Sequence, residues 1–507
     1  MAAGVLLFAG YLRLSGTVVV GSDGGTIALQ AWDMLHGNVL LHGWAMSDVS
    51  FYPTELPEYV LVERLHGLGP ETVHIAGAAT YTIVVLLAAV AAQGRTGGRE
   101  GITRALIAAG IMLAPAPGFG ASTLLLSPDH FGSTVPVLLA WLVIDGWGMR
   151  RPAPAAVAAV GVILAAGVVA DPLVEVTGVV PMVLIFAIRA VQRARTRQHY
   201  WFEAAIATAA VVAVGVAAIV LALIRAAGGF VVSPVSTGFA GLAALPHHLF
   251  LAGQGILLLF GASFIRGQPV NMLFSVLHLA GVAMAATALC ISLRRLFRLD
   301  EIVLPALAVA VILNIALYVL GRYPTDPLST REISAVLPLG AVLAGRALAA
   351  FALRARLVPV LSAVLAGYAV TLGINGSQPQ APALHQDLAS WLVARRLASG
   401  LAPSYWLANV TTLDSGGRAR VIQVSIAKTG AANGEVRRPV RWETSARWYQ
   451  PDRDHADFLV TDAMPGSPAW RSAVAAARAT FGPPAQIRRY EQYTIIIWTT
   501  NVLSYLH

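Results

Sequence analysis

Acidic and basic side chains stand at the ends of apolar stretches of this sequence. Asp23 follows the run VVV in the segment VVVGSDGGTIALQ, and two glycines come directly after it. An acid in this position either caps a helix that begins near Thr26, since Asp is a favoured N-cap residue, or faces a polar site. Arg331 stands in STREIS, just before the apolar stretch AVLPLGAVLAG. A cation at such a boundary suits an anionic lipid headgroup.

The elements that must position these side chains are membrane spans. The chain has 507 residues, of which 57% are hydrophobic and only 12% are charged. An ordinary soluble protein has about 25% charged residues. Apolar runs of about 20 residues, the length that crosses a bilayer, recur along most of this chain. The composition therefore indicates a multi-pass membrane protein. The single cysteine excludes a disulfide framework and a thiolate metal cluster.

We predict eleven membrane spans, and the arginines fix their orientation. The spans cover approximately 2–20, 73–93, 104–121, 133–148, 154–171, 173–191, 203–224, 272–293, 302–321, 334–352 and 358–374. Arginines gather in short loops between them, as is typical of cytoplasmic loops, so the net charge of +9 does not indicate nucleic-acid binding. These loops all lie on one side only if the apolar stretch 249–264, which is short for a span, stays outside as a re-entrant or interfacial helix.

The character of the sequence changes near Asn375, where the linker NGSQPQAP begins. We expect residues 1–374 to form a transmembrane domain, with a first outer loop at 21–72 that holds interfacial helices. Residues 375–507 have a mixed composition and interleave strand patterns such as RVIQVSIA and YTIIIWTT with helical ones, which predicts a small α/β domain. An odd number of spans from a cytoplasmic start makes this domain extracytoplasmic, on the same face as Asp23.

More polar groups recur at the outer ends of the predicted spans. They are Asp129 and His130 in SPDHFGS, Asp171 and Glu175 in VADPLVEV, and Arg322, Tyr323, Asp326, Arg331 and Glu332 in GRYPTDPLSTREIS. Each acid taken singly is explained as a solvated loop charge. Together they predict a polar cavity at the outer leaflet, because such groups are costly near lipid unless they face protein or water.

Four features, in order along the chain, resemble the GT-C superfamily of polytopic glycosyltransferases, which use polyprenyl-phosphate sugars as donors. They are the acid after the first span in GSDGG, a long first outer loop with interfacial helices, many spans, and a C-terminal outer domain. STREISAVLPLG is similar to the RYL-P segment of many such enzymes, although Glu332 replaces the usual aromatic residue. The segment SDVSFYPTELPEYVLVERLHG also looks like a group of uncharacterised bacterial membrane proteins of this type.

The resemblance implies an inverting glycosyltransferase of the bacterial plasma membrane. It would move a sugar from a polyprenyl phosphate to a cell-envelope acceptor: a glycan, a lipid or a protein. Asp23 would be the general base that activates the acceptor hydroxyl. Arg331, with Arg322, would bind the donor phosphate and stabilise the charge of the leaving group. The next candidates, as acceptor-binding or second acidic groups, are Asp129, His130 and Glu55.

No cofactor is predicted. The candidate residues show no HxxxH or DxD spacing, and a monophosphate leaving group needs a metal less than a nucleotide diphosphate does. Asp23, Asp129 and His130 together leave a divalent metal as an open alternative. If the enzyme hypothesis is right, Arg331 lies within about 10 Å of Asp23, a span that fits one sugar and its phosphate.

Two other function classes stay open. A transporter is suggested by APAPGFG, which breaks a span, and by Asp145 within another span, although the sequence has no internal repeat and its polar groups sit at one face. A non-catalytic GT-C-like scaffold would share the architecture without the chemistry. In the outer domain, Trp442, Trp448 and Tyr449 either stack on the sugars of an acceptor or pack the small domain.

Overall fold

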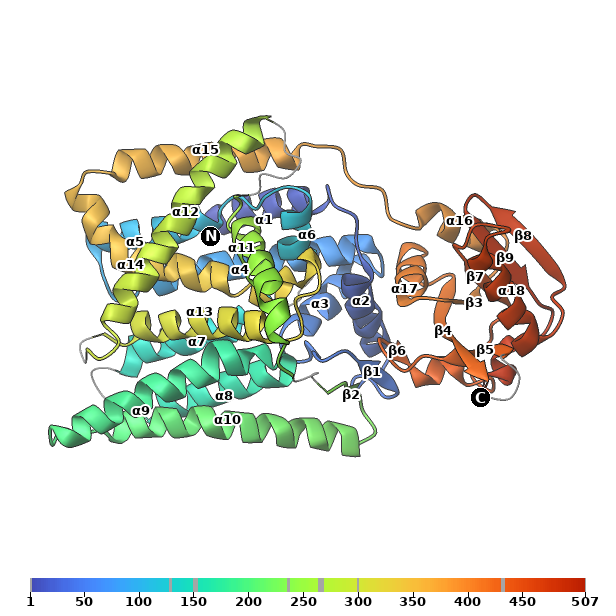
Figure 1. The fold of residues 1–507 in the computed structure, drawn as a ribbon, viewed down its shortest axis with the longest axis horizontal. Coiled ribbons are helices and arrows are strands. Elements are labelled where there is room, and N and C mark those ends of the chain that lie inside the picture. Colours follow the sequence, from blue (N-terminus) through green and yellow to red (C-terminus); the bar gives the residue numbers. More distant parts are fainter. Residues whose placement is uncertain are drawn as a thin grey trace.

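The computed structural model describes residues 2–126, 130–148, 154–234, 238–262, 269–298, 301–429 and 434–506. Two parts stand side by side in Figure 1: a long helical bundle, and a smaller domain built around a β-sheet that holds the C-terminus. The predicted fold class, an α-helical multi-pass membrane protein with a small C-terminal α/β domain, is confirmed.

Helices from α1 to α15, apart from two in the first outer loop, form the bundle. They are α1 (Ala2–Ser15), α4 (Pro70–Gln93), α5 (Gly98–Met112), α6 (Phe119–Leu125), α7 (Thr134–Val143), α8 (Pro154–Ala170), α9 (Val180–Arg195), α10 (Trp201–Ala226), α11 (Leu245–Leu259), α12 (Pro269–Arg294), α13 (Val303–Leu320), α14 (Val336–Arg354) and α15 (Val358–Gly376). α14 packs against α4, α5, α12 and α13, so the core of the bundle lies around it. Prolines stand in the first turn of α4, α9 and α15, where a missing N–H costs no hydrogen bond.

Among the described residues, eight helices are long and apolar enough to cross a membrane. Seven of them coincide with predicted spans, and shorter apolar helices cover Ala2–Ser15, Thr134–Gly146 and Pro154–Ala170, where three more spans are predicted. Every predicted span therefore overlaps a helix. The count of eleven membrane crossings stays a prediction.

The predicted span 104–121 is interrupted. α5 ends at Met112, and α6 begins at Phe119. Pro115 and Pro117 lie between them, and neither can donate a backbone hydrogen bond or fit inside a regular helix. The break that APAPGFG predicts in this span is therefore present, and a shorter helix lies on each side of it.

Most of the apolar stretch 249–264, which is short for a membrane span, belongs to a longer helical segment in the structure. A 3₁₀ turn, η3 (Leu242–Ala244), leads directly into α11. Together they form an apolar helical segment of 18 residues, which is long enough to cross a membrane. The predicted shortness is therefore wrong. α11 contacts α13 and α14, and in Figure 1 it lies across them rather than along them, so its interfacial placement stays a prediction.

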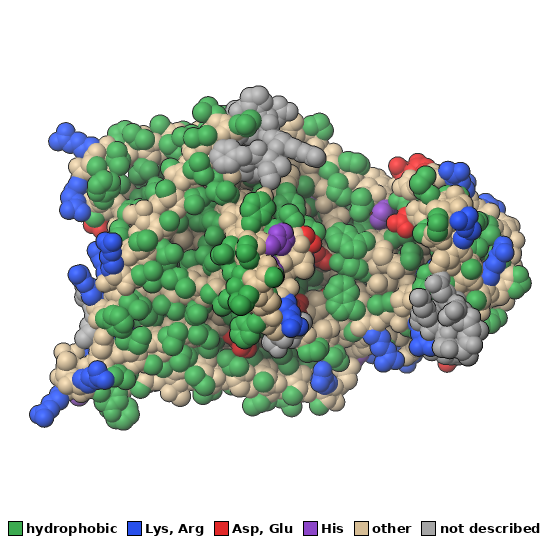
Figure 2. Space-filling model, viewed as in Figure 1, with side chains coloured by type: hydrophobic (Ala, Val, Ile, Leu, Met, Phe, Trp, Pro, Cys, Tyr) green, Lys and Arg blue, Asp and Glu red, His purple; other side chains and the backbone are tan. Residues whose placement is uncertain are grey.

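The two ends of the bundle differ in charge. Lys and Arg side chains gather at the end that faces away from the C-terminal domain, while hydrophobic side chains cover the length of the bundle (Figure 2). Arginines also occupy the last turns of α9, α12 and α14. This distribution is the one expected if the basic end is cytoplasmic.

The C-terminal domain contains a six-stranded mixed sheet of order β5-β4-β3-β7-β9-β8. The central strand β3 runs parallel to β4 and β7, and the outer pairs are antiparallel. The elements are α16 (Gln386–Ala394), β3 (Ser399–Ala402), α17 (Tyr405–Asp414), β4 (Arg420–Thr429), β5 (Gly434–Pro439), β7 (Phe458–Thr461), α18 (Pro468–Phe481), β8 (Gln486–Tyr490) and β9 (Tyr493–Ile497). The boundary predicted after residue 374 falls in the last turn of α15, and a division there stays a prediction.

A second, three-stranded sheet joins the first outer loop to the C-terminal domain. β1 (Trp44–Met46) pairs in parallel with β2 (Val231–Val232) and antiparallel with β6 (Thr444–Ser445). The loop also contains α2 (Ser22–Leu35) and α3 (Glu55–His66), and α17 packs against α2. The first outer loop and the C-terminal domain therefore meet along α2.

Candidate functional site

Asp23 lies in the first turn of α2. The helix begins at Ser22, and its N-cap residue, Gly21, makes no side-chain capping bond. The alternative that Asp23 caps a helix starting near Thr26 is therefore wrong. The carboxylate is left to interact with groups outside its own helix, and the N–H groups at the start of α2 add a positive field that favours its charged form.

Close packing at Gly24 explains why a glycine follows Asp23 in GSDGG. A Cβ at this position would lie 2.7 Å from the carbonyl oxygen of Leu126 and 2.6 Å from a methyl group of Val73. Only glycine therefore allows α2 to pack so closely on the start of α4. This packing fixes the first turn of α2, and with it Asp23, against the bundle.

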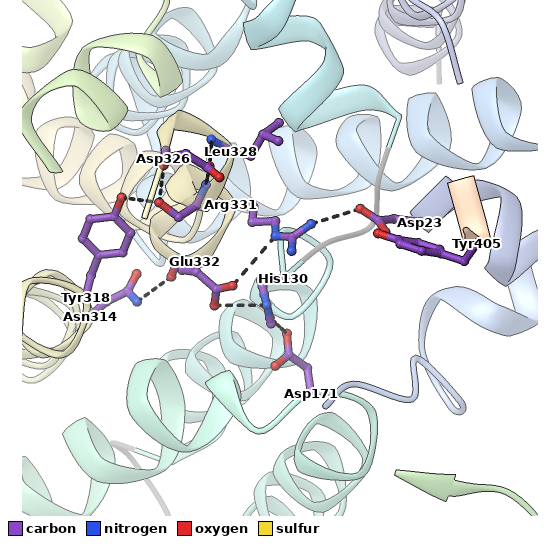
Figure 3. A network of polar contacts seen from close by, with 11 residues as sticks. Asp23, His130, Asp171, Asn314, Tyr318, Asp326, Leu328, Arg331, Glu332 and Tyr405 are labelled. Carbon is purple, nitrogen blue, oxygen red and sulfur yellow. Dashed lines mark hydrogen bonds and ion pairs between the residues drawn. The ribbon is translucent and has the colours of Figure 1, made fainter. Parts of the chain in front are cut away.

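Asp23 contacts an arginine and a tyrosine from distant parts of the chain (Figure 3). Arg331 Nη1 donates to Asp23 Oδ2 at 3.0 Å, and the hydroxyl of Tyr405 donates to Asp23 Oδ1 at 3.2 Å. The side chains of Arg331 and Asp23 are 40% and 27% exposed, so a ligand can reach both. The separation is well inside the 10 Å that the enzyme hypothesis requires.

A short 3₁₀ helix, η4 (Pro327–Ile333), carries Arg331. Asp326 caps it: its Oδ1 accepts from the backbone N–H of Leu328 at 2.8 Å and of Ser329 at 3.3 Å. Asp in the cap and proline in the first turn are both typical of a helix start. The segment TDPLSTRE therefore specifies a rigid turn that presents Arg331.

Two side chains of helix α13 hold this turn by hydrogen bonds (Figure 3). The Tyr318 hydroxyl lies 2.9 Å from Ser329 Oγ, and Asn314 Nδ2 donates to the carbonyl oxygen of Glu332 at 2.9 Å. Both partners on α13 are buried or nearly so. The position of Arg331 is thus fixed by the bundle itself.

Glu332 joins Arg331 to a second group of charges. His130 Nε2 lies 3.2 Å from Glu332 Oε2, and His130 Nδ1 lies 2.8 Å from Asp171 Oδ2. His130 is buried and has a φ of +57°, an uncommon and strained conformation for a histidine. A continuous chain of polar contacts therefore runs from Asp171 through His130 and Glu332 to Arg331 and Asp23 (Figure 3).

The two carboxylates hold His130 in its charged form. Burial alone would lower the pKa of His130, but Asp171 and Glu332 raise it well above its usual value. Burial would likewise raise the pKa of Glu332, but His130 and Arg331 lower it. Both nitrogens of the protonated ring donate to carboxylates, so His130 has no lone pair with which to take a proton.

A cavity of about 360 Å³ opens beside Glu332. Apolar side chains of α13 and of the segment after Asp171 form part of its wall. The polar part consists of four acids, Asp48, Asp171, Glu175 and Glu332, together with His130, Asn314, Tyr318 and Tyr323. Burial raises the pKa of Asp48 above its usual value. Such a wall accepts hydrogen bonds from hydroxyl groups and disfavours anions, so it suits a hydroxyl-rich, uncharged group.

The structure does not place all the predicted site residues in this network. Glu55 is 3% exposed, accepts a hydrogen bond from the Thr54 hydroxyl, and has its pKa raised by burial to about 8, so its carboxyl group is largely neutral at pH 7. Arg322 Nε donates to the carbonyl oxygen of Phe239 at 3.0 Å. Asp129 lies outside the described residues.

The described acids of this network do not form a metal site. Within the described ranges, no group of three or more His, Cys, Asp or Glu side chains is arranged to hold a metal ion. His130 uses both ring nitrogens in contacts with carboxylates. The open alternative of a metal at Asp23, Asp129 and His130 therefore gains no support from the described residues.

Tyr405 is a site residue that the sequence analysis missed. It is separated from Asp23 by 382 positions, and no motif surrounds it. The ring of Trp442 lies 4.8 Å from that of Tyr405, and Trp442 is 37% exposed, so this predicted sugar-stacking residue borders the site. Tyr449, in contrast, is buried in the C-terminal domain, and its hydroxyl donates to the backbone of Gln423. The packing alternative is right for Tyr449.

Comparison with known proteins identifies the fold. No family model and no curated protein sequence matches this chain. The structure of ArnT from Cupriavidus metallidurans in the apo state matches with a TM-score of 0.57 at 16% identity, over 100% of this chain and 98% of that chain. The same protein bound to undecaprenyl phosphate matches with a TM-score of 0.57 at 14% identity, over the same shares.

An oligosaccharyltransferase from Archaeoglobus fulgidus, in complex with Zn and sulfate, matches more weakly. Its TM-score is 0.47 at 11% identity, over 93% of this chain and 69% of that chain, which is too low to carry an argument. The match to ArnT spans the bundle and the C-terminal domain together. The chain therefore shares the fold of ArnT over its whole described length.

Proposed function

We propose that this protein is an inverting glycosyltransferase that moves a sugar from a polyprenyl phosphate to a cell-envelope acceptor at the outer face of the membrane. One observation carries the proposal: an accessible carboxylate, Asp23, and an accessible guanidinium, Arg331, lie 3.0 Å apart where the bundle meets the C-terminal domain. The likeness to ArnT, which has been solved with undecaprenyl phosphate, supports a lipid-linked donor.

Arg331 binds the phosphate that joins the sugar to the lipid. Its guanidinium contacts Asp23, and its Nε lies 3.8 Å from Glu332 Oε1. A phosphate competes with these carboxylates for the planar fork of N–H donors, which matches two phosphate oxygens at once. As the sugar–phosphate bond breaks, negative charge grows on the leaving group, and a cation already in place stabilises it.

Asp23 acts as the general base. The acceptor hydroxyl oxygen forms a bond to the anomeric carbon, the bond from that carbon to the phosphate oxygen breaks, and Asp23 takes the hydroxyl proton. This single displacement inverts the configuration of the anomeric carbon. Tyr405 donates to the other oxygen of Asp23 and thereby orients the carboxylate.

The acid-lined cavity beside Glu332 binds the sugar of the donor. Its carboxylates accept hydrogen bonds from the sugar hydroxyls. We assign His130 a positioning role in place of the acceptor-binding or acidic role predicted from sequence, because it sits between Asp171 and Glu332 and both of its nitrogens are engaged. It fixes Glu332, and through Glu332 the turn that carries Arg331.

The outer location of this site rests on charge. The basic end of the bundle faces away from the C-terminal domain, and the positive-inside rule makes that end cytoplasmic. Asp23 and the C-terminal domain then lie outside, where a lipid-linked donor and a cell-envelope acceptor meet.

No specific observation favours the transporter. Asp145, the intramembrane acid that suggested it, pairs with the buried Arg346 inside the bundle. A non-catalytic scaffold has the same architecture as the enzyme, so activity must separate the two.

The decisive experiment is sugar transfer from a mixture of polyprenyl-phosphate sugars by membranes that contain the wild-type protein or Asp23→Asn. We expect transfer by the wild type and a loss of about a hundredfold or more in the variant, the range for removal of a general base. Asp387→Asn is the matched control, because Asp387, like Asp23, is an acid in the first turn of a helix, and it is exposed. Equal transfer by the wild type and Asp23→Asn contradicts the assignment, and no transfer by the wild type from any donor contradicts the function.

A further inference from the structure

A second cavity, of about 740 Å³, lies between α2 and the C-terminal domain. The last turn of α2 contributes Trp32 and Asp33 to its wall, and His36, the residue after the helix, also lines it. Leu29 of α2 and Leu68 of the first outer loop add apolar contacts, and the C-terminal domain contributes the remaining residues, including Arg418, Trp448 and the loop 451–455. The cavity therefore exists only because the two parts of the molecule are docked. None of the residues labelled in Figure 3 lines it.

The cavity and the candidate catalytic acid lie at opposite ends of one helix. Asp23 is in the first turn of α2 and Trp32 is nine residues further on, which is about 14 Å along the axis at the rise of an α-helix. α17 follows α2 over the same length: Tyr405 contacts Asp23, and Asn409 donates to Thr26 Oγ1 at 2.7 Å. The separation corresponds to a short oligosaccharide and exceeds one sugar.

The aromatic groups of this cavity suit sugar rings. Trp32 is half-buried, and its ring lies 4.3 Å from that of His36. Trp448 is also half-buried and lies 4.9 Å from Trp44, edge to face. Each indole is thus held in place by a neighbouring ring and still forms part of the cavity wall. Rigid, partly exposed indoles supply apolar contact area at a low cost in conformational entropy.

The charges of the cavity are balanced. Arg420 pairs with Asp454, and the Asp33 carboxylate accepts hydrogen bonds from Trp44 Nε1 at 2.8 Å and from Asn38 Nδ2 at 2.6 Å. The exposed rim adds Arg418, Arg453 and Asp452, so neither sign dominates. This combination of many hydrogen-bonding groups and little net charge favours an uncharged, hydroxyl-rich ligand over a phosphate or a polyanion.

We propose that the cavity between α2 and the C-terminal domain binds the chain of a neutral oligosaccharide acceptor, some sugars away from the hydroxyl that reacts at Asp23. This inference rests on the proposed function and deepens it, because it selects a glycan from the possible acceptors. The enzyme then extends a glycan chain, and Trp32 and Trp448 bind the sugars that precede the growing end.

Binding of soluble glycans to the detergent-solubilised full-length protein tests the inference without requiring turnover. The probes are neutral gluco-, manno- and galacto-configured tetrasaccharides, with the corresponding monosaccharides for comparison. We expect at least one tetrasaccharide to bind at least tenfold more tightly than its monosaccharide. Trp32→Ala and Arg453→Ala should each weaken that binding, the first by tenfold or more. Arg453 is an exposed rim residue, so its variant stays informative if Trp32→Ala folds poorly.

Trp201→Ala is the matched control, because Trp201 is 70% exposed and lies at the start of α10, outside the cavity. Its binding should equal that of the wild type. The inference is overturned if no tetrasaccharide binds the wild type, or if binding is unchanged in both Trp32→Ala and Arg453→Ala. Loss of transfer in Asp23→Asn together with that result leaves the proposed function intact and removes only the glycan acceptor. If glycans bind at Trp32 but the wild type transfers sugar from no donor, the glycan site stands and the proposed function fails.

Discussion

Two aspartate–arginine pairs in this protein have the same chemistry and opposite surroundings. Inside the bundle, Arg346 pairs with Asp145, and their side chains are 6% and 18% exposed. Where the bundle meets the C-terminal domain, Arg331 pairs with Asp23, and their side chains are 40% and 27% exposed. The inner pair is closed off from ligands, whereas the outer pair is open to them.

The further contacts of the two arginines also differ. Arg346 Nε also donates to the carbonyl oxygen of Ala91 at 2.7 Å, and its Nη1 lies 4.0 Å from Glu301. These contacts tie α14 to α4 and to the loop before α13. Arg331 instead connects Asp23, from the first outer loop, to a turn between two spans. The buried pair braces helices, and the accessible pair is the one to which we assign the proposed reaction.

Removal of one acid from each pair sharpens this difference most. Asp145→Asn leaves a buried arginine without its main counter-charge, which costs about 3 kcal/mol or more of stability. We expect a much lower melting temperature and abundance for Asp145→Asn, measured by thermal unfolding in detergent, with transfer per folded molecule near that of the wild type. Asp23→Asn should show the opposite, with a normal melting temperature and a transfer rate lower by at least about a hundredfold. Equal destabilisation by both variants would erase the distinction.

Replacement of the outer arginine tests its phosphate role. Arg331→Gln removes the cation and should lower kcat by about a hundredfold or more, as expected for loss of a group that stabilises developing charge. Arg331→Lys keeps the positive charge but lacks the planar fork of N–H donors, and it should retain more activity than Arg331→Gln. The control is Arg322→Gln. Arg322 follows α13 in the same loop as Arg331, but it donates to the backbone of Phe239, so its loss should matter little. If Arg322→Gln is as damaging, Arg322 shares the phosphate as the sequence analysis predicts.

Removal of the Tyr405 hydroxyl tests whether the C-terminal domain takes part in the chemistry. Tyr405→Phe deletes a hydrogen bond to a charged carboxylate, which is worth roughly tenfold in rate if it persists in the transition state. We expect kcat to fall by about tenfold with KM for the donor unchanged, measured by initial rates of transfer. Tyr493→Phe, which deletes a hydroxyl that contacts His385 in the same domain, is the control. A rise in KM alone would assign Tyr405 to binding.

The smallest expected effect concerns the dependence of stability on pH. The pKa of His130 is raised above its ordinary value of 6.5 in the folded protein. Its contribution to stability is therefore complete below pH 6.5 and is lost as pH rises through the raised pKa. The melting temperature of the wild type should fall over that window, and His130→Gln should flatten the fall. His199→Gln, a change at an exposed histidine, should keep the wild-type slope. An unchanged slope in His130→Gln would mean that His130 is neutral.

Local pattern was sufficient for most elements of the fold, for Asp23 and Arg331, and for the polar residues at the outer ends of spans that the network brings together. Apolar runs of about 20 residues predict membrane helices directly, because a bilayer imposes that length. Asp23 and Arg331 could be found because each interrupts or borders an apolar stretch. One error arose where the length of a helix was judged from its most apolar part, because α11 begins earlier than that part.

Other features depend on contacts that no spacing in the sequence encodes. Tyr405 reaches Asp23 only because α17 packs along α2. His130 contacts two carboxylates only because Asp171 and Glu332 approach it from separate segments. Glu55 has the residue type of a second acid, yet its environment is buried, and burial rather than sequence decides its protonation.

The sequence by itself therefore determined the membrane architecture, the orientation expected from its arginines, and the acid and the arginine at one end of the bundle. These follow from hydrophobicity and charge, which act residue by residue. The tertiary structure decided which charges meet, which of them ligands can reach, and that two domains enclose a second cavity. Those properties arise from packing between distant segments, and they exist only once the chain has folded.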